Sequence, residues 1–210
     1  MTTPSATSEP PNRAGRRKAL TRARLLDAAR ELFARQGVEA TRIGEITEAA
    51  DVGAGSFYNH FPDKDAIVEA VLRDLTASQG DRVDALTRDL DDPAAVIAYA
   101  HHHFLALART DPTFAHLLVR LDLSHHVLRD ALGPHARRDV RAGMASGRFA
   151  VADADVAVYA MGGALLGVMR AVLDGALGPD AGVQHVEGVL RGLGVDGDEA
   201  AALARRSRHR

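Results

Sequence analysis

The segment 43–61, IGEITEAADVGAGSFYNHF, constrains the fold more than any other part of the chain, because it reads as two short helices joined by a tight turn. Each half has one apolar face at helical spacing, formed by Ile43, Ile46 and Ala50 in the first half and by Phe57 and Phe61 in the second. We therefore predict a helix-turn-helix whose second helix presents polar side chains to bases and phosphates in a DNA major groove. An ordinary helical hairpin with a polar surface fits this segment alone equally well.

A further helix, predicted over residues 21–37, supplies the support that a helix-turn-helix needs. Its apolar stripe consists of Leu25, Leu26, Ala29, Leu32 and Phe33. Gly37 stands where a left-handed C-terminal cap is expected, and Thr21 and Thr41 are candidate N-terminal caps of this helix and the next. The upstream sequence thus favours a three-helix DNA-binding domain over a plain hairpin.

Basic residues crowd the N-terminal end of the chain. Up to residue 24 only Glu9 opposes Arg13, Arg16, Arg17, Lys18, Arg22 and Arg24. Because the surrounding sequence is rich in Pro, Ser and Thr, we predict a disordered basic leader over residues 1–17. Such an arm suits phosphate contact or insertion into the minor groove, and Arg17 and Lys18 are the candidate contacts. The alternative is a solvated tail that aids solubility.

Residues 21–72, about a quarter of the chain, resemble the DNA-binding domain of TetR/AcrR-type transcriptional regulators. The resemblance rests on the LLDAARELFARQGVEAT opening, on the ITEAADVGAGSFYNHFPDKDAIVEAVL continuation and above all on the Tyr-Asn-His-Phe-Pro-x-Lys sequence at 58–64. It implies a homodimeric regulator, usually a repressor, that binds a palindromic operator. It further implies that a small molecule bound to the C-terminal domain lowers the affinity for the operator.

The resemblance also implies DNA contacts for individual residues. Positions near phosphates in the family are held here by Thr41, Arg42, Tyr58, His60 and Lys64. Positions that face base edges are held by Gly44, Thr47, Ala54, Gly55, Ser56 and Asn59. The chain departs from the family pattern at Gly53, which replaces a Ser or Thr cap, and at Ala54, which replaces a frequent lysine and removes one phosphate contact. Thr47, Ser56 and Asn59 remain the predicted direct readers of bases.

Length and composition limit the remaining possibilities. The 210 residues suffice for a DNA-binding domain and a second helical domain with its own core. Without cysteine there are no disulfides and no thiolate chemistry, the N-terminus lacks the apolar run of a secretory signal, and the longest stretch without a charged residue or a histidine, 156–169, is too short to cross a membrane. We therefore expect a cytoplasmic protein. The net charge of −2 does not oppose DNA binding, because basic groups gather in the leader and on the DNA face.

Beyond residue 70 the sequence predicts helices and no strand, so the expected fold class is all-α. The expected domains are the leader 1–17, a helix-turn-helix domain 18–78, a helical ligand-binding and dimerisation domain 79–195, and a flexible tail 196–210. The expected helices run from 63 or 65 to 79 and over 81–90, 93–109, 112–121, 124–132, 134–147, 153–174 and 179–193. Asp92 followed by Pro93 is the clearest helix start.

The last two of these helices are the predicted dimer interface. The residues Val183, Val186, Leu190 and Leu193 repeat at spacings of three, four and three, which suits a self-complementary seam. In the helix before, small residues including Gly163 and Gly167 allow a neighbouring helix to approach closely. The TetR/AcrR resemblance implies that both helices pair with their symmetry mates in a four-helix bundle. A core within one subunit is the alternative.

Helix 93–109 carries the predicted ligand-binding face. The candidates that share or border its apolar stripe are Tyr99, His103, Phe104 and Leu107. An imidazole beside such a stripe can orient a small, largely hydrophobic ligand, and Phe114, Met144 and Met169 are further candidates. The alternatives are a core or partly exposed histidine and plain packing. A cavity of a few hundred cubic ångströms would separate a ligand-binding domain from a solid core.

No cofactor and no metal are expected. The neighbours His101, His102 and His103 diverge by about 100° along a helix, so they do not converge on one ion. Motifs of zinc proteases, serine hydrolases, phosphate loops and EF-hands are absent, which argues against an enzyme. We therefore predict a repressor that binds palindromic double-stranded DNA as a homodimer and is released by a small-molecule effector. The alternatives are an activator and a ligand-independent DNA binder.

Overall fold

The computed structural model describes residues 13–119, 130, 132–178 and 180–208, and within these ranges every regular element is a helix. The all-α prediction is therefore confirmed for the described part of the chain. The chain forms two compact units, Met1–Val71 and Leu72–Arg210. Their boundary lies inside α4 (Lys64–Thr87) rather than at residue 78, so this helix contributes its first residues to unit 1 and the others to unit 2.

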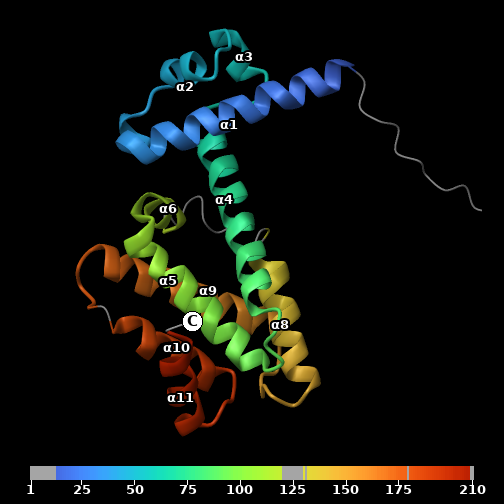
Figure 1. The fold of residues 1–210 in the computed structure, drawn as a ribbon, viewed down its shortest axis with the longest axis vertical. Coiled ribbons are helices and arrows are strands. Elements are labelled where there is room, and N and C mark those ends of the chain that lie inside the picture. Colours follow the sequence, from blue (N-terminus) through green and yellow to red (C-terminus); the bar gives the residue numbers. More distant parts are fainter. Residues whose placement is uncertain (1–12, 120–129, 131, 179, 209–210) are drawn as a thin grey trace, which may run out of the picture. The chain divides into compact units, whose positions relative to one another are not determined.

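Unit 1 is built from α1 (Arg13–Ala40), α2 (Ile43–Ala49), α3 (Ala54–Tyr58) and the start of α4. α1 contacts α2, and α2 contacts α3 (Figure 1). The predicted apolar faces form the core, where the fully buried side chains are Leu25, Ala29, Ile46, Phe57, Ile67, Val68 and Val71. Because both short helices pack their apolar faces inward, their other faces remain available to a partner.

The start of α1 corrects the prediction of a disordered leader over residues 1–17. Arg13 to Arg17 are helical, and the Thr21 hydroxyl donates to the carbonyl of Arg17 at 3.1 Å instead of capping a new helix. Residues 1–12 lie outside the described part of the chain. At the other end, Gly37 has a φ of 80° and interrupts the helix, which suits a residue without a side chain at the predicted break.

The turn between α2 and α3 is tight because Asp51 adopts a φ of 53°, a conformation that Asp tolerates better than most residues. Gly53 follows in an extended conformation as the N-cap of α3, without a side-chain hydrogen bond. α3 has only five residues, and the amides of His60 and Phe61 both donate to the carbonyl of Phe57. The predicted helix-turn-helix is thus present, with Gly53 in the predicted cap position.

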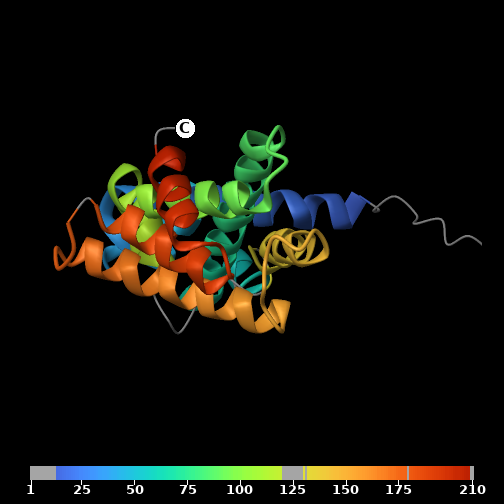
Figure 2. The same ribbon diagram turned by 90° about the horizontal axis from the view of Figure 1, so that it is seen from below.

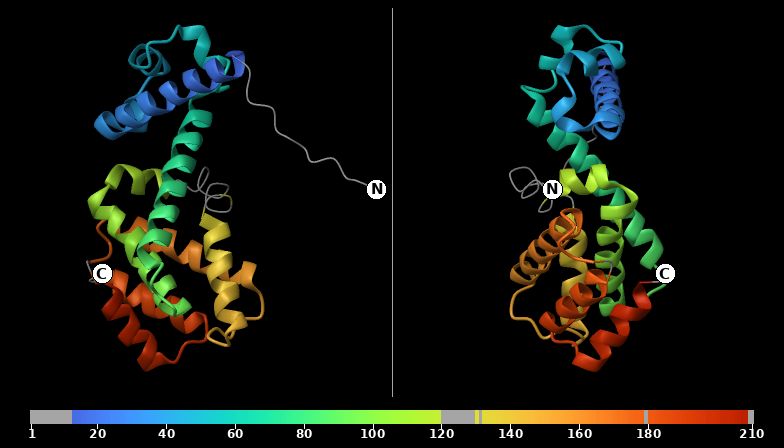
Figure 3. Two further views of the ribbon diagram at one scale, coloured as in Figure 1. Left: turned by 45° about the vertical axis from the view of Figure 1, so that its right-hand side comes forward. Right: turned by 90° about the vertical axis from the view of Figure 1, so that its left-hand side faces the viewer.

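Unit 2 contains the rest of α4 and six further described helices, α5 (Pro93–Thr110), α6 (Pro112–Leu118), α8 (Gly133–Ala145), α9 (Ala154–Leu173), α10 (Ala181–Gly192) and α11 (Gly197–Ser207). α5 contacts α6, α8, α9, α10 and α11 (Figure 3). α5 and α6 have the same kind of N-cap. Asp92 and Asp111 each accept a hydrogen bond from an amide of the first turn, and a proline follows directly. The start predicted at Asp92 is confirmed.

Two expectations for the ends of unit 2 are wrong. Residues 81–87 continue α4 instead of belonging to a separate short helix. The flexible tail predicted from residue 196 is a helix, α11, whose Ala200, Leu203 and Ala204 are buried against α5 and α10. Asp196 caps it by accepting from the amides of Asp198 and Glu199. The expected helix 124–132 lies almost wholly outside the described residues.

Candidate functional site

The outer face of unit 1 presents most of the side chains that were predicted to contact DNA. Tyr58 is 62% exposed, its ring packing edge-on against the buried Phe57 at a centroid distance of 5.4 Å. Asn59, the C-cap of α3, is also exposed, and Ser56 is half-buried. The other exposed residues of this prediction are Arg42, Gly44, Ala54 and Gly55. These positions come from α2, α3 and the turn between them, so they form one candidate nucleic-acid interface.

Cations from α1 border this interface. Arg22 lies over the ring of Phe61 at 5.1 Å, and Arg17 and Lys18 are exposed one turn earlier. The pKa of His60 is lowered, first by its partial burial and then by the nearby charges of Lys18 and Arg22. These groups gather positive charge beside the interface, which suits a polyanion.

Two of the predicted DNA contacts are buried. Thr41 is 1% exposed and its hydroxyl donates to the carbonyl of Gly37 at 2.7 Å, while Thr47 is 4% exposed and donates to the carbonyl of Gly44 at 2.9 Å. Neither hydroxyl faces a partner from outside, so the assignment of Thr47 as a base reader is wrong for this structure. Thr41 does not cap α2 either: Arg42 is the N-cap residue, and the Glu45 side chain in the first turn accepts from the amide of Arg42.

Lys64 opens α4, and its ammonium donates to the carbonyl of Glu39 at 3.3 Å. This hydrogen bond ties the start of α4 to the end of α1 within unit 1. The lysine is half-buried, so part of it remains accessible at this corner. Its predicted contact with a phosphate stays a prediction.

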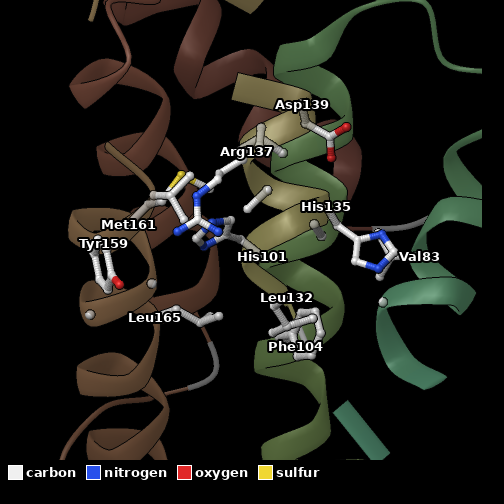
Figure 4. A pocket seen from close by; sticks show the side chains of 18 of the residues that line it. Val83, His101, Phe104, Leu132, His135, Arg137, Asp139, Tyr159, Met161 and Leu165 are labelled. Atoms are coloured by element: carbon white, nitrogen blue, oxygen red, sulfur yellow. The ribbon is translucent and has the colours of Figure 1, made fainter. Parts of the chain in front are cut away.

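Unit 2 contains a cavity of about 310 Å³ (Figure 4). Its walls are contributed by α4, α5, α8 and α9, and its apolar lining includes Val83, Ile97, Phe104, Val158, Met161, Leu165 and Leu166. The volume lies at the lower end of the range of about 300–1,000 Å³ that is usual for small-molecule sites. Unit 2 is therefore not a solid core, and its cavity suits a small, largely apolar ligand.

One corner of the cavity is polar. Asp84 of α4 accepts two hydrogen bonds from the Arg138 guanidinium, both at 2.8 Å, and lies 2.8 Å from Nδ1 of His135. The Arg138 hydrogen bonds lower the pKa of Asp84 to about 2. Burial instead raises the pKa of Asp139, which also lines the cavity. This corner links α4 to α8 through groups that can both donate to and accept from a ligand.

A histidine also faces the cavity from α5. His101 is 4% exposed and lines the cavity, and its Nδ1 lies 2.8 Å from Nε2 of His185 on α10. Burial lowers the pKa of His101 to about 3 and that of His185 to about 4. Both imidazoles are therefore neutral near pH 7, and one N–H lies in the bond between them.

Most of the residues predicted to bind a ligand lie elsewhere. Of the predicted set, Phe104 lines the 310 Å³ cavity, whereas Tyr99, His103, Leu107, Phe114, Met144 and Met169 do not. His103 donates to or accepts from the side chain of Gln79 at 2.8 Å and stacks on Tyr99. Met169 and Phe114 are buried packing residues. The helix predicted to bind a ligand, α5, does border the cavity, but the face that borders it carries His101 rather than His103.

The predicted dimer residues divide into two groups. Val186, Leu190 and Leu193 are buried in the core of unit 2 with Leu203 and Ala204 of α11, and Val183 packs against that core. For this seam the single-subunit alternative is therefore correct. Gly163 and Gly167 on α9 are exposed, with nothing within 4 Å of an added Cβ.

α9 runs along one side of unit 2 (Figure 2). Its exposed side chains include the apolar Val156 and the aromatic Tyr159, 67% and 48% exposed. Its length and its mean hydropathy of 1.8 would suffice to cross a membrane, with 22% of that window buried. A groove of about 740 Å³ runs between α9 and α10, lined by residues such as Ala157, Ala160, Gln184 and Gly188. Among the described residues, no three His, Asp or Glu side chains converge as metal ligands would.

Comparison with protein families matches both units. The family described as bacterial regulatory proteins, tetR family, matches residues 25–71. The tetracyclin repressor-like C-terminal domain matches residues 92–206, more than half of the chain. The chain belongs to the TetR family of transcriptional regulators. The predictions of the family, of a non-enzymatic regulator and of the helical fold are thereby confirmed.

Among TetR-family structures, the crystal structure of RolR in complex with resorcinol is similar over most of the molecule. It is 36% identical, covers 91% of this chain and 96% of RolR, and has a TM-score of 0.84. RolR without ligand gives a TM-score of 0.81. The FadR regulator from Bacillus subtilis, solved with stearoyl-CoA, shares the fold at a TM-score of 0.63 with 19% identity.

The curated relatives match over shorter stretches of the chain. The transcriptional repressor KstR2 of Rhodococcus jostii (strain RHA1) is 38% identical over 71 residues, which is 34% of this chain and 32% of that protein. The regulator AcrR of Shigella flexneri is 33% identical over 92 residues, 43% of each chain. The chain thus matches less than half of the length of these relatives.

The sequence reasoning missed most of the cavity. Asp84, His135 and Asp139 come from two helices and meet only in the folded unit. His101 was singled out only as one member of a histidine run. Its place on the buried face, one turn before Phe104 and Leu105, was the signal that could have separated it from His102 and His103.

Proposed function

We propose that the chain is a repressor that binds a palindromic operator as a homodimer and leaves it when a small, largely apolar ligand enters unit 2. One observation carries this proposal. α4 begins with Lys64, a predicted phosphate contact in unit 1, and without interruption supplies Gly80, Val83 and Asp84 to the cavity of unit 2. A single helix therefore connects the ligand site to the DNA-binding unit along the chain.

For the DNA-bound state, we assign Tyr58, His60, Arg42 and Lys64 to phosphates and Ser56 and Asn59 to base edges, with Arg17 and Lys18 adding charge beside them. The exposure of Tyr58 and Asn59 supports these roles. Phosphate contacts position a protein on DNA, whereas base contacts specify the sequence. Two such heads about 34 Å apart would match the two halves of a palindrome.

For the dimer, we propose that the outer face of α9 and the groove between α9 and α10 receive the same elements of a second copy. The exposed apolar side chains of α9 and the open space around Gly163 and Gly167 support this assignment. Substituting Arg for Ala164, which lines the groove, should convert the dimer into a monomer in sedimentation experiments. An unchanged mass would contradict this interface.

For the ligand, we propose a hydroxylated benzene, because the RolR structure that resembles this chain over most of its length contains resorcinol. The polar corner at Asp84, His135 and Asp139 offers partners for hydroxyl groups, and the remaining walls are mostly apolar. To act as a switch, the ligand must favour the state that does not bind DNA. A hundredfold loss of affinity for the operator requires about 2.7 kcal/mol of differential binding.

The test begins with full-length protein and fragmented genomic DNA of its source in low salt. Retained fragments, sequenced, should share a palindrome, and resorcinol should release them. A control with Tyr58→Phe combined with His60→Ala should retain less DNA of every sequence. If no fragment is retained in the absence of effectors, the proposal is wrong. If fragments are retained but the protein raises the expression of a reporter gene placed under the recovered palindrome, the regulator is an activator.

A further inference from the structure

A buried imidazole pair joins the cavity to α10. The rings of His101 and His185 are 84 residues apart in sequence, yet their centroids are 5.0 Å apart and Nδ1 of His101 lies 2.8 Å from Nε2 of His185. His101 is almost completely buried, and it lines the cavity near its centre (Figure 4). Neither residue belongs to the polar corner formed by Asp84, Arg138 and His135.

The second ring nitrogen of His101 has no hydrogen-bond partner among the described residues. Its Nδ1 is engaged with His185, and no group of the described chain reaches its Nε2. An imidazole nitrogen that borders open space keeps its capacity to donate or accept a hydrogen bond, which water or a bound molecule can use. Since His101 lines the cavity, a molecule held there is a candidate partner for Nε2.

The pairing limits the chemistry of that partner. If Nε2 of His185 donates, His101 presents Nε2–H to the cavity; if Nδ1 of His101 donates, it presents a lone pair. Burial keeps both rings neutral, because it lowers their pKa values well below 7. A hydroxyl group can both donate and accept, so it fits either arrangement, whereas a carboxylate only accepts and an ammonium only donates.

We propose that His101 recognises a hydroxyl group of the ligand through Nε2, and that His185 is the positioning residue that holds the His101 ring. This inference rests on the proposed function, because it requires that the cavity binds an effector. It adds a hydroxyl-reading group on α5, separate from the polar corner between α4 and α8. It also predicts that the cavity prefers a neutral phenol to an apolar molecule of the same shape.

The test compares phenol with toluene, which differ by a hydroxyl in place of a methyl group. Calorimetry on the full-length protein gives the ratio of the two affinities. His101→Phe should lower the preference for phenol about tenfold, as expected for one lost hydrogen bond, without weakening toluene. His103→Phe is the matched control, because His103 is half-buried on the same helix, bonds to Gln79 and does not line the cavity; its ratio should equal that of the wild type.

The positioning role has its own readout. His185→Leu should lower the phenol preference and His185→Gln, whose amide can still bond to His101, should restore most of it. Should His101→Phe fail to fold, ¹⁵N spectra of the wild-type histidines decide the point: phenol should shift the Nε2 resonance of His101 and toluene should not. If the ratio of phenol to toluene affinity is unaltered in His101→Phe, or if phenol does not shift the Nε2 resonance of His101, then His101 does not read the hydroxyl group. The proposed function is not affected by either result. If the wild type binds neither probe, the proposed ligand class fails, and this inference fails with it.

Discussion

The two units carry their functional groups in different ways. In unit 1, most of the candidate DNA contacts come from one continuous segment, 42–64, with Arg17 and Lys18 of α1 beside it, and the exposure of that segment follows from two short amphipathic helices. In unit 2, the cavity is lined by residues from 80 to 166, drawn from helices that meet only after folding. A local motif therefore specifies the candidate DNA-binding surface, whereas tertiary packing specifies the cavity.

Two histidines, one in each unit, differ in the same way. His60 is half-buried beside Lys18 and Arg22, so its imidazole lies in a positive environment close to water. His101 is buried against another neutral imidazole and an apolar cavity. The first environment suits contact with a phosphate, and the second suits a neutral ligand. The same side chain thus lies in a different environment in each unit.

The largest expected effect separates the two units. Phe57→Ala removes a completely buried ring from unit 1 and should lower its free energy of unfolding by about 3–5 kcal/mol. DNA binding should be lost, while calorimetry should find the same affinity of unit 2 for resorcinol. Loss of both activities would show that the units do not act as separable sites.

A smaller effect is expected inside unit 2. Gly143→Ala places a Cβ 2.0 Å from the buried ring of Phe149 and should lower the free energy of unfolding by about 1–3 kcal/mol. Gly182→Ala is the control, since its Cβ would lie 3.5 Å from His102, an ordinary contact. Denaturant unfolding of both variants measures the difference. Equal stabilities would contradict the close packing of α8 against the Phe149 segment.

The base readers can be separated within unit 1. Asn59→Ala should relax the base preference at one operator position by about 1–3 kcal/mol, because an exposed amide would be lost from the groove. Thr47→Val should leave the preference unchanged, since Thr47 is buried and bonded to the carbonyl of Gly44. Selection of binding sites from random DNA gives both preferences. The opposite pattern would make Thr47 a base reader and show that Asn59 is not one.

The smallest effect is a dependence of DNA binding on pH. In the free protein the pKa of His60 is lowered by burial and by Lys18 and Arg22, and a phosphate beside it should raise that pKa. Binding then takes up a proton, so the affinity for DNA should increase severalfold as the pH falls from about 7.5 to about 6. His60→Asn should remove this slope. An identical slope in the variant would assign the proton to another group.

The sequence predicted unit 1 well because its rules are local. The spacing of Ile46, Phe57 and Phe61 specifies which faces are buried, and the Asp-Val-Gly turn specifies where the helices break. It failed for Thr41 and Thr47, because a threonine just after or within a helix can turn its hydroxyl back to a carbonyl about one turn earlier. That choice depends on packing against α1, which spacing does not reveal.

Unit 2 was predicted only in outline. The Asp-Pro start of α5 is a local signal and was found, but the periodicity of α10 fits a dimer seam and an internal core equally well. α11 decides between them, since Leu203 and Ala204 cover the seam. α11 was predicted as a flexible tail because its end is rich in charge, and Arg205 and Arg206 lie on its exposed face. Which helices enclose the cavity depends on contacts far apart in sequence.

The most direct test of the proposed switch is the affinity of the full-length protein for its recovered operator with and without saturating resorcinol, measured by fluorescence anisotropy. The account predicts nanomolar-range binding that weakens at least about a hundredfold with the ligand, equivalent to about 2.7 kcal/mol. An operator affinity that does not change while calorimetry shows resorcinol bound in unit 2 would contradict it.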